Sequence, residues 1–154
     1  MPIKKILVTG SSGTIGTRLC EKLLEEGFEV CGADIRPNKW NAKINLLTTL
    51  IDLTNKSGLP KMPKGCDLLI HLAANARVYN IVLDPGQSRD NFEMSFNVLE
   101  HCRGAGIKRL IFASSREVYG NIEMDTLKEE DALIESSESP YSASKAATEC
   151  FVRA

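Results

Sequence analysis

The chain has 154 residues, of which 43% are hydrophobic and 25% charged, enough to bury one ordinary globular core. Its formal net charge of −1, with acids and bases interspersed, excludes electrostatic binding of nucleic acid or of an anionic membrane as the basis of function. The apolar run at the N-terminus is too short for a signal peptide, and no later run approaches a membrane span, so we expect a cytoplasmic protein.

Five short apolar runs predict strands. The first of them is rich in β-branched and aliphatic residues and lacks polar alternation, which is typical of a central parallel strand covered on both faces. In chain order these runs are residues 4–9, 28–34, 48–51, 67–72 and 109–114.

The first connection predicts a helix and a later one does not. Apolar residues recur at helical spacing from Thr14, and Gly27 favours a left-handed stop after them. A turn is predicted at residues 36–38. Residues 54–65 contain two prolines and two glycines, so we expect a loop or a shortened helical turn there.

Two more helices are predicted in the second half of the chain. A long one ends near Gly104, and its apolar stripe is predicted to comprise Phe92, Phe96, Leu99 and Cys102. The acidic stretch 121–138 is predicted to be a loop, and Ser139-Pro140 opens a final helix. Strands alternating with right-handed helical connections give an α/β, doubly wound parallel sheet of Rossmann-like type, with strand order 3-2-1-4-5.

A glycine-rich turn lies between the first strand and the first helix. It reads Gly10-Ser11-Ser12-Gly13-Thr14-Ile15-Gly16. Backbone N–H groups and the helix dipole at such a turn can hold a pyrophosphate, and only glycine permits the close approach. The preceding strand, the following helix and an acid at the expected distance favour dinucleotide binding over a flexible turn.

That acid is Asp34, eighteen residues beyond Gly16 at the end of the second strand. It can accept hydrogen bonds from both hydroxyls of an adenosine ribose and would repel a 2′-phosphate, so NAD is favoured over NADP. Arg36 is the complication, because it can pair with such a phosphate; the alternative is a solvated turn residue. Asp52 can reach an adenine amino group or serve as a plain loop acid, and the sequence leaves both open.

The chain's two histidines and five cysteines predict structural roles. His71 is expected to be a buried, hydrogen-bonded strand residue, and His101 to lie on the outward part of a helix. The cysteines are odd in number and fall in apolar segments, so reduced core thiols are favoured over disulfides or zinc, and no metal site is predicted. They are Cys20, Cys31, Cys66, Cys102 and Cys150.

A possible catalytic set follows the fifth strand. Tyr141 and Lys145 are four residues apart and share a helix face, and Ser115 can hydrogen-bond the same substrate oxygen. Tyrosine has a pKa of about 10, so its use as a base near neutrality requires a nearby cation. The alternative is that Tyr141 and Lys145 are a surface pair that has this spacing by chance. Their position after the fifth strand favours the catalytic interpretation.

Together these residues resemble the extended short-chain dehydrogenase/reductase family, the NAD-dependent epimerases and dehydratases of nucleotide sugars. The matching residues occur in family order over the whole chain. They are Val8-Thr9-Gly10 through Gly16, Asp34, Asp52-Leu53, His71-Leu72-Ala73-Ala74, Asn91, Asn97-Val98-Leu99-Glu100, Ser114-Ser115 to Tyr119-Gly120, and Ser139-Pro140-Tyr141 to Lys145.

The resemblance implies a role for each matching position. It implies that Tyr141 is the acid/base, that Lys145 binds the nicotinamide ribose and lowers the tyrosine pKa, and that Ser115 orients the reacting hydroxyl. The residues that would contact NAD are Gly10, Gly13, Thr14, Ile15, Gly16, Asp34, Asp52, Leu53, Leu72, Ala73, Ala74, Asn91, Tyr141 and Lys145.

The resemblance also sets the expected function. Family members transfer a hydride at a sugar carbon, so the substrate is expected to be a nucleotide sugar or a sugar acid, and a homodimer is expected. Some dehydratases keep an Asp before the residue matched by Glu117, and Arg116 stands there instead, which counts against dehydration. Sugar dehydrogenation and a non-catalytic NAD-binding module are the alternatives to epimerisation. Residues 1–154 are expected to be an incomplete NAD-binding domain that ends before the last strands and the substrate-binding region, with little turnover of its own.

Overall fold

The computed structural model describes residues 2–154 of the chain. They form two compact units. The first runs to Ala74 and resumes with Met94–Ala113, whereas the second comprises Asn75–Glu93 and Ser114–Ala154. We describe each unit by itself.

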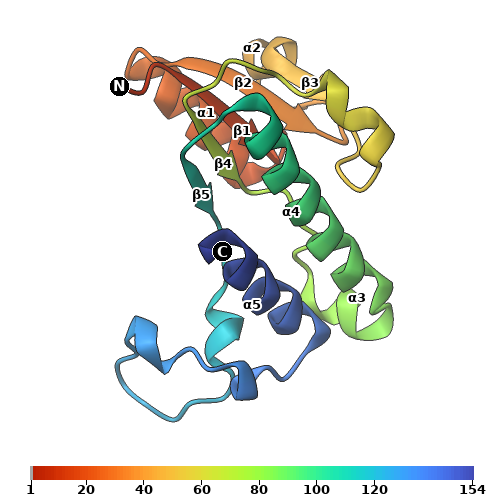
Figure 1. Cartoon of the computed structure of the whole chain (residues 1–154), viewed down its shortest axis with the longest axis vertical. Helices are drawn as coiled ribbons and strands as arrows, with labels where there is room; N and C mark the ends of the chain where they lie inside the picture. The colour runs from red at the N-terminus through yellow and green to blue at the C-terminus, as the bar shows by residue number, and fades with distance from the viewer. Residues whose placement is uncertain (1) are drawn as a thin grey trace. The chain divides into compact units, whose positions relative to one another are not determined.

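The first unit contains a five-stranded parallel sheet (Figure 1). Its order, β3-β2-β1-β4-β5, confirms the predicted doubly wound topology. Right-handed crossovers dictate this order once strands and helical connections alternate. The strands are β1 (Lys5–Thr9), β2 (Glu29–Asp34), β3 (Thr48–Leu50), β4 (Leu68–His71) and β5 (Leu110–Phe112).

The connections of the first unit agree in part with the predictions. Helix α1 (Thr14–Glu25) ends before Gly27, whose φ of +85° is the predicted left-handed stop. The proline-containing segment forms a short 3-10 helix, η1 (Lys56–Lys61), as expected. Helix α2 (Ala42–Leu47) was not predicted, because Ile44 is its one buried residue and so it lacks an apolar period.

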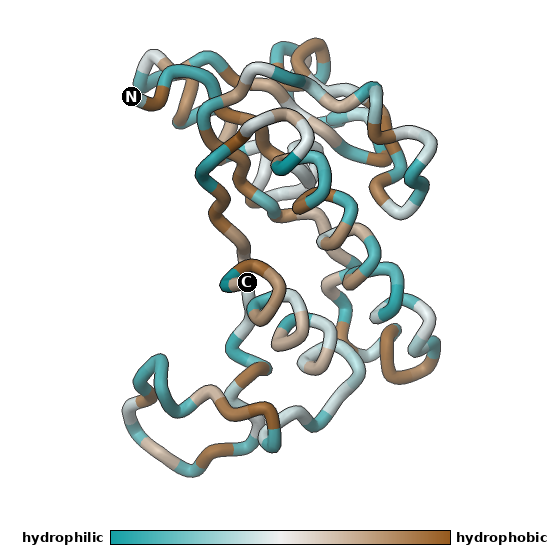
Figure 2. Tube along the Cα trace, viewed as in Figure 1, coloured by the Kyte–Doolittle hydropathy of each residue, from teal (hydrophilic) through white to brown (hydrophobic). Residues whose placement is uncertain are grey.

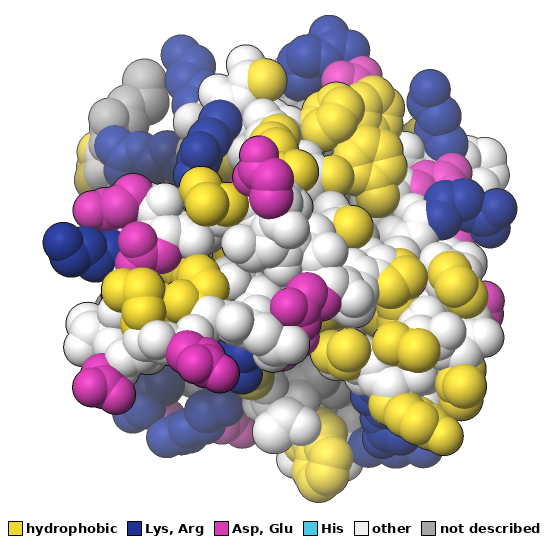
Figure 3. All heavy atoms as spheres, turned by 90° about the horizontal axis from the view of Figure 1, so that it is seen from below, with side chains coloured by type: hydrophobic (Ala, Val, Ile, Leu, Met, Phe, Trp, Pro, Cys, Tyr) yellow, Lys and Arg dark blue, Asp and Glu magenta, His cyan; other side chains and the backbone are white. Residues whose placement is uncertain are grey.

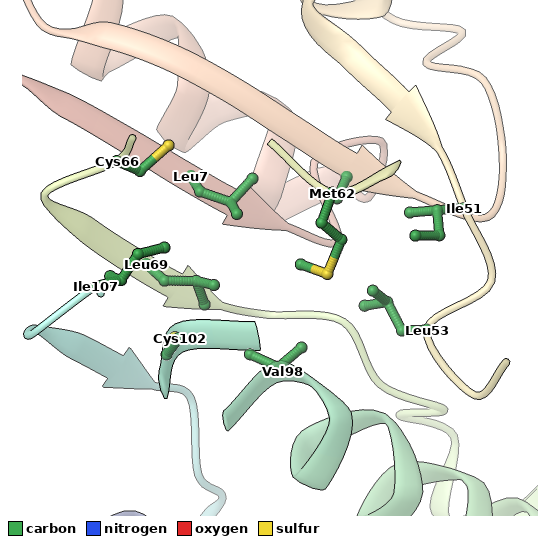
Figure 4. Close-up of a cluster of buried hydrophobic side chains, with 10 residues drawn as sticks. Leu7, Ile51, Leu53, Met62, Cys66, Leu69, Val98, Cys102 and Ile107 are labelled. Carbon is green, nitrogen blue, oxygen red and sulfur yellow. The ribbon is translucent and has the colours of Figure 1, made fainter. Parts of the chain in front are cut away.

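Two apolar clusters cover the two faces of the sheet. On one face, Leu7 and Leu69 pack with Met62 and with Val98 and Cys102 of α4 (Gly86–Ala105), as Figure 4 shows. The cluster on the other face contains Ile6, Val8, Cys20 of α1 and Ile44 of α2. Burial on both faces explains why the central strands read as unbroken apolar runs. Figure 2 shows β5 as a continuous hydrophobic stretch as well.

The predicted apolar stripe of α4 is right for Cys102, which is buried in the core, and wrong for Phe96. Phe96 is 41% exposed, whereas Ser95 and Val98 are buried. The buried face also carries polar residues with specific partners. The Asn97 amide donates to the Leu53 carbonyl at 2.8 Å, so this buried polar side chain is hydrogen-bonded beside the apolar residues Val98 and Cys102.

The second unit is mainly helical. It contains α3 (Val78–Leu83), the start of α4, three short 3-10 helices and α5 (Pro140–Arg153). Ser139 caps α5 by accepting the Ser142 N–H at 3.1 Å, so the predicted helix start is confirmed. The 3-10 helices are η2 (Arg116–Tyr119), η3 (Glu129–Asp131) and η4 (Ile134–Ser136). The last two interrupt the predicted loop, and α3 was not predicted.

Two expectations about single residues need correction. His101 is buried rather than outward, and its Nε2 donates to the Pro63 carbonyl at 3.0 Å while burial lowers its pKa. Cys150 is exposed, unlike the buried thiols of Cys20, Cys66 and Cys102. Within residues 2–154, every helix is too short or too polar to cross a lipid bilayer.

Candidate functional site

The glycine-rich turn is built without room for side chains at two of its glycines. Gly10 has a φ of +74°, and a Cβ there would lie 2.8 Å from the Ala73 nitrogen. A Cβ on Gly16 would lie 2.0 Å from the Gly10 carbonyl oxygen. Gly13 is less confined, with one contact at 3.3 Å. The turn therefore brings bare backbone to the start of α1, where the N–H groups of the first turn have no helical acceptor.

Asp34 lies at the carboxyl end of β2, as predicted, and it is buried. Its Oδ2 accepts the Ser12 N–H and its Oδ1 accepts the Arg36 N–H, both at 2.9 Å. These two bonds orient the carboxylate beside the glycine-rich turn and leave each oxygen further acceptor capacity. The side chain of Arg36 is exposed.

Asn38 is an organising residue that sequence reasoning missed. Its buried amide donates to the Ser11 carbonyl at 3.1 Å and to the Thr17 hydroxyl at 2.7 Å. Its Oδ1 accepts the N–H groups of Trp40 and Asn41. Asn38 thereby ties the segment after Asp34 to the glycine-rich turn. An asparagine inside a predicted turn was the available signal, but nothing in the sequence named its partners.

Asp52 and Leu53 follow β3 and differ in exposure. The exposed Asp52 carboxylate accepts the N–H and the hydroxyl of Thr54, at 2.9 and 2.8 Å, which is a local turn. Leu53 is 3% exposed and belongs to the core, and its carbonyl accepts a hydrogen bond from the Asn97 amide. Of the two interpretations of Asp52, the local turn is the one that the geometry displays.

The segment after β4 carries further predicted positions. Leu72, Ala73 and Ala74 are partly buried at the carboxyl edge of the sheet, where Ala73 packs against Gly10. In the second unit, Asn91 is buried, accepts the Asn75 N–H at 2.6 Å and donates to its carbonyl at 3.0 Å. The amide of Asn91 therefore holds the backbone of Asn75.

The second unit brings together the predicted catalytic residues of α5. Tyr141 and Lys145 are buried, at 7% and 6% exposure, and the Lys145 Nζ lies 5.9 Å from the centre of the Tyr141 ring. They are therefore not a surface pair. Burial lowers the pKa of Lys145 to about 8, which still leaves the ammonium as its main form at neutral pH.

Ser115 lies at the start of η2 in the same unit. Its Oγ accepts the Glu117 N–H at 3.2 Å, and η2 packs against α5. The neighbouring Ser114 hydroxyl donates to Glu149, one turn beyond Lys145 on α5. This hydrogen bond, which the sequence did not suggest, anchors the Ser115 segment to the helix that carries Tyr141. Among residues 2–154, no group of three or more His, Cys, Asp or Glu side chains is arranged to hold a metal ion.

Comparison with known proteins gives a consistent match. The profile of the NAD dependent epimerase/dehydratase family matches residues 6–154. A UDP-glucuronate 4-epimerase of Thermodesulfobacterium geofontis is 32% identical over 158 residues, which cover 93% of this chain and 48% of that protein. A UDP-glucose 4-epimerase of Pisum sativum is 34% identical, covering 92% of this chain and 45% of the relative.

Solved structures agree with these relatives. A UDP-galactose 4-epimerase superimposes with a TM-score of 0.83 at 33% identity, covering 96% of this chain and 50% of that chain. The UDP-glucose 4-epimerase of Thermus thermophilus, solved in complex with NAD, gives a TM-score of 0.82 at 32% identity, with coverage of 97% and 50%. The chain thus spans about half the length of the relatives it matches.

Proposed function

The chain belongs to the NAD dependent epimerase/dehydratase family, and from this premise we propose that it is the NAD-binding part of a nucleotide-sugar epimerase. The observation that carries the catalytic part of the proposal is the buried pair of Tyr141 and Lys145 on α5. Burying an ammonium group is costly, and a chain that keeps one beside a phenol has a chemical use for it.

The cofactor proposal rests on the fit of the residues around the glycine-rich turn. Gly10 and Gly16 leave bare backbone for a pyrophosphate, and the buried Ser12 Oγ has no hydrogen-bond partner among the described residues. Asp34 would accept from the adenosine ribose hydroxyls, and its charge disfavours a 2′-phosphate. Such a site suits NAD. Backbone groups of Thr14 and Ile15 would meet the pyrophosphate, and residues 72–74 and Asn91 would lie along the dinucleotide.

In the proposed reaction the chain's residues move a proton and orient the sugar. When bound, NAD supplies the hydride acceptor. Tyr141, acting as the phenolate, would take the proton of the reacting sugar hydroxyl and become the phenol, and the Lys145 ammonium beside it would bind the nicotinamide ribose. Ser115 holds the same sugar oxygen. Exclusion of water by the buried setting of Tyr141 strengthens these interactions.

Two other functions are carried as alternatives. A sugar-acid dehydrogenase uses the same Ser115, Tyr141 and Lys145 and differs in releasing its reduced cofactor. Arg116 makes dehydration the weaker alternative, since its side chain lies beside Glu117 and offers no acid. A non-catalytic NAD-binding module is the second alternative function, and the buried Tyr141–Lys145 pair argues against it.

The test joins this chain to the carboxyl-terminal half of a close relative. We expect nucleotide-sugar epimerase activity from the hybrid and negligible turnover from the 154-residue chain alone, because orientation of the sugar contributes roughly 7–11 kcal/mol to such reactions. Tyr141→Phe should abolish the hybrid's activity while sparing NAD affinity, and Tyr79→Phe, at an exposed tyrosine, should change neither. A fully active Tyr141→Phe hybrid would refute the catalytic assignment. NAD reduction by a simple uronate would favour the dehydrogenase.

We also propose that the chain self-associates, as expected of a homodimer. Strand β5 is the edge of the sheet, and its Ile111 is 53% exposed. Unpaired backbone at such an edge is a template for another strand. Hydrophobic side chains are also exposed in the second unit, and they include Tyr79, Leu83 and Phe151. Figure 3 shows one face of the molecule, on which hydrophobic side chains lie among acidic and basic ones.

A further inference from the structure

A line of buried hydrogen bonds runs through the first unit at the carboxyl ends of β1 and β4. The Thr9 hydroxyl lies 2.6 Å from Nδ1 of His71, and Nε2 of His71 lies 3.1 Å from the Ser95 hydroxyl on α4. The Ala73 N–H donates to the same Thr9 oxygen at 3.3 Å. All three side chains are at most 5% exposed, so the line is shielded from water.

The hydrogen-bond partners of each side chain determine which atoms along this line carry a proton. The Thr9 oxygen already accepts the Ala73 N–H, and the one acceptor for its hydroxyl hydrogen among the described residues is Nδ1 of His71. His71 therefore carries its proton on Nε2 and donates it to Ser95. The opposite tautomer would bury the Thr9 hydroxyl hydrogen without an acceptor, which is unfavourable.

The end of the line lies against the glycine-rich turn. Ala73 follows β4 directly, and a Cβ on Gly10 would lie 2.8 Å from the Ala73 nitrogen and 2.9 Å from the Leu72 carbonyl carbon. No room is left for even a methyl group between the two backbones, so a shift of Ala73 toward the turn would press on the backbone of Gly10. The direction of the Ala73 N–H is in turn set by the Thr9 hydroxyl.

We propose that Thr9, His71 and Ser95 are positioning residues that fix the Ala73 turn for the dinucleotide, His71 acting through the Thr9 hydroxyl. The inference rests on the proposed NAD site. His71 would then do more than fill the core. Its ring links Ser95 of α4 to the Thr9 hydroxyl, which in turn holds the Ala73 N–H. Phe112 of β5, whose ring centre is 5.8 Å from that of His71, restricts the imidazole on another side.

Binding measurements on the 154-residue chain test this role. Thr9→Val keeps the shape of the side chain and removes the hydroxyl, and Thr9→Ser keeps the hydroxyl. Calorimetric titration should show NAD affinity reduced about three- to tenfold in Thr9→Val, the effect of one buried hydrogen bond, and restored in Thr9→Ser. AMP, which would be held mainly at the Asp34 end, should bind both variants as it binds the wild type.

A spectroscopic measurement tests this line of hydrogen bonds independently of NAD binding. Imidazole ¹⁵N chemical shifts should show His71 in the Nε2–H tautomer in the wild type, with His101→Gln identifying the second histidine signal. Ser95→Ala, which leaves Thr9 in place, should weaken this tautomer preference and lower NAD affinity less than Thr9→Val does.

The outcomes separate this inference from the proposed function. Absence of NAD binding by the wild-type chain would overturn the proposed function and the inference together. NAD binding that is equally tight in wild type and folded Thr9→Val, or equal losses for NAD and AMP, would overturn the inference alone. An Nδ1–H tautomer in the wild type would overturn it as well.

Discussion

Replacing Gly16 by alanine adds one methyl group at the most confined point of the glycine-rich turn. The new Cβ would lie 2.0 Å from the Gly10 oxygen, 2.8 Å from the Gly10 carbonyl carbon and 3.0 Å from the Ser11 Cα, whereas ordinary contacts begin at 3.4 Å. All three neighbours are backbone, so no side chain can swing aside. The turn or the start of α1 must therefore shift to make room.

Gly10 cannot yield easily, because its N–H donates to the Ala33 carbonyl at 2.8 Å and Ala73 fills the space behind it. Overpacking of this kind costs roughly 1–3 kcal/mol or more, against which alanine regains somewhat under 1 kcal/mol of helix propensity. We expect Gly16→Ala to lose about 2 kcal/mol of unfolding free energy and about 4–8 °C of Tm. NAD affinity should fall too, because the N–H groups that we propose face the pyrophosphate move with the turn.

Gly13→Ala is the matched control for stability. Gly13 is exposed, has a φ of −74° that alanine adopts freely, and would place its Cβ 3.3 Å from a single atom. Urea and thermal melts followed by circular dichroism should show it within roughly 1 kcal/mol of wild type, the range of a helix N-cap change. Equal stability of Gly16→Ala and wild type, or equal losses in both variants, would refute the packing argument.

Three further predictions concern cofactor choice, pH and association. Calorimetry should show NAD binding tighter than NADP, with the preference reduced in Asp34→Asn; tighter NADP binding that is lost in Arg36→Ala would show that Arg36 governs the choice instead. Burial lowers the pKa of Lys145 from 10.5 to about 8, so the unfolded chain binds more protons between those pH values and the stability of the fold rises with pH there. Lys145→Met should therefore stabilise the chain most at pH 7 and progressively less toward pH 10.5 in urea titrations, and a gain independent of pH would contradict this cause. Light scattering at high micromolar concentration should show self-association that Ile111→Lys weakens, whereas a clean wild-type monomer would rule out the edge-strand proposal.

The sheet was predictable because its signals are local. An apolar strand, three glycines and a helix with a glycine stop are read within about thirty residues, and the crossover rule then orders the strands. Asp34 is found for the same reason, since its distance from Gly16 and the end of β2 place it beside the turn. The start of α5 at Ser139-Pro140 is equally local.

The features that sequence reasoning missed depend on partners far along the chain. Asn97 donates to the Leu53 carbonyl, 44 residues away, and His101 donates to the Pro63 carbonyl, 38 residues away. The Ser114–Glu149 bond and the bonds from the Asn38 amide to Ser11 and Thr17 likewise join residues more than twenty positions apart. Buried polar residues on a helix give no periodic pattern in the sequence. Their contacts are therefore identified from the three-dimensional structure and not from the sequence.

Titration of the 154-residue chain with NAD tests the central claim most directly. The account predicts saturable binding at one site per chain, because the glycine-rich turn, Asp34 and the Ala73 turn all belong to a compact unit with its own core. The chain's fold would be confirmed in the same sample by circular dichroism. A folded chain that gives no saturable binding of NAD would contradict the account.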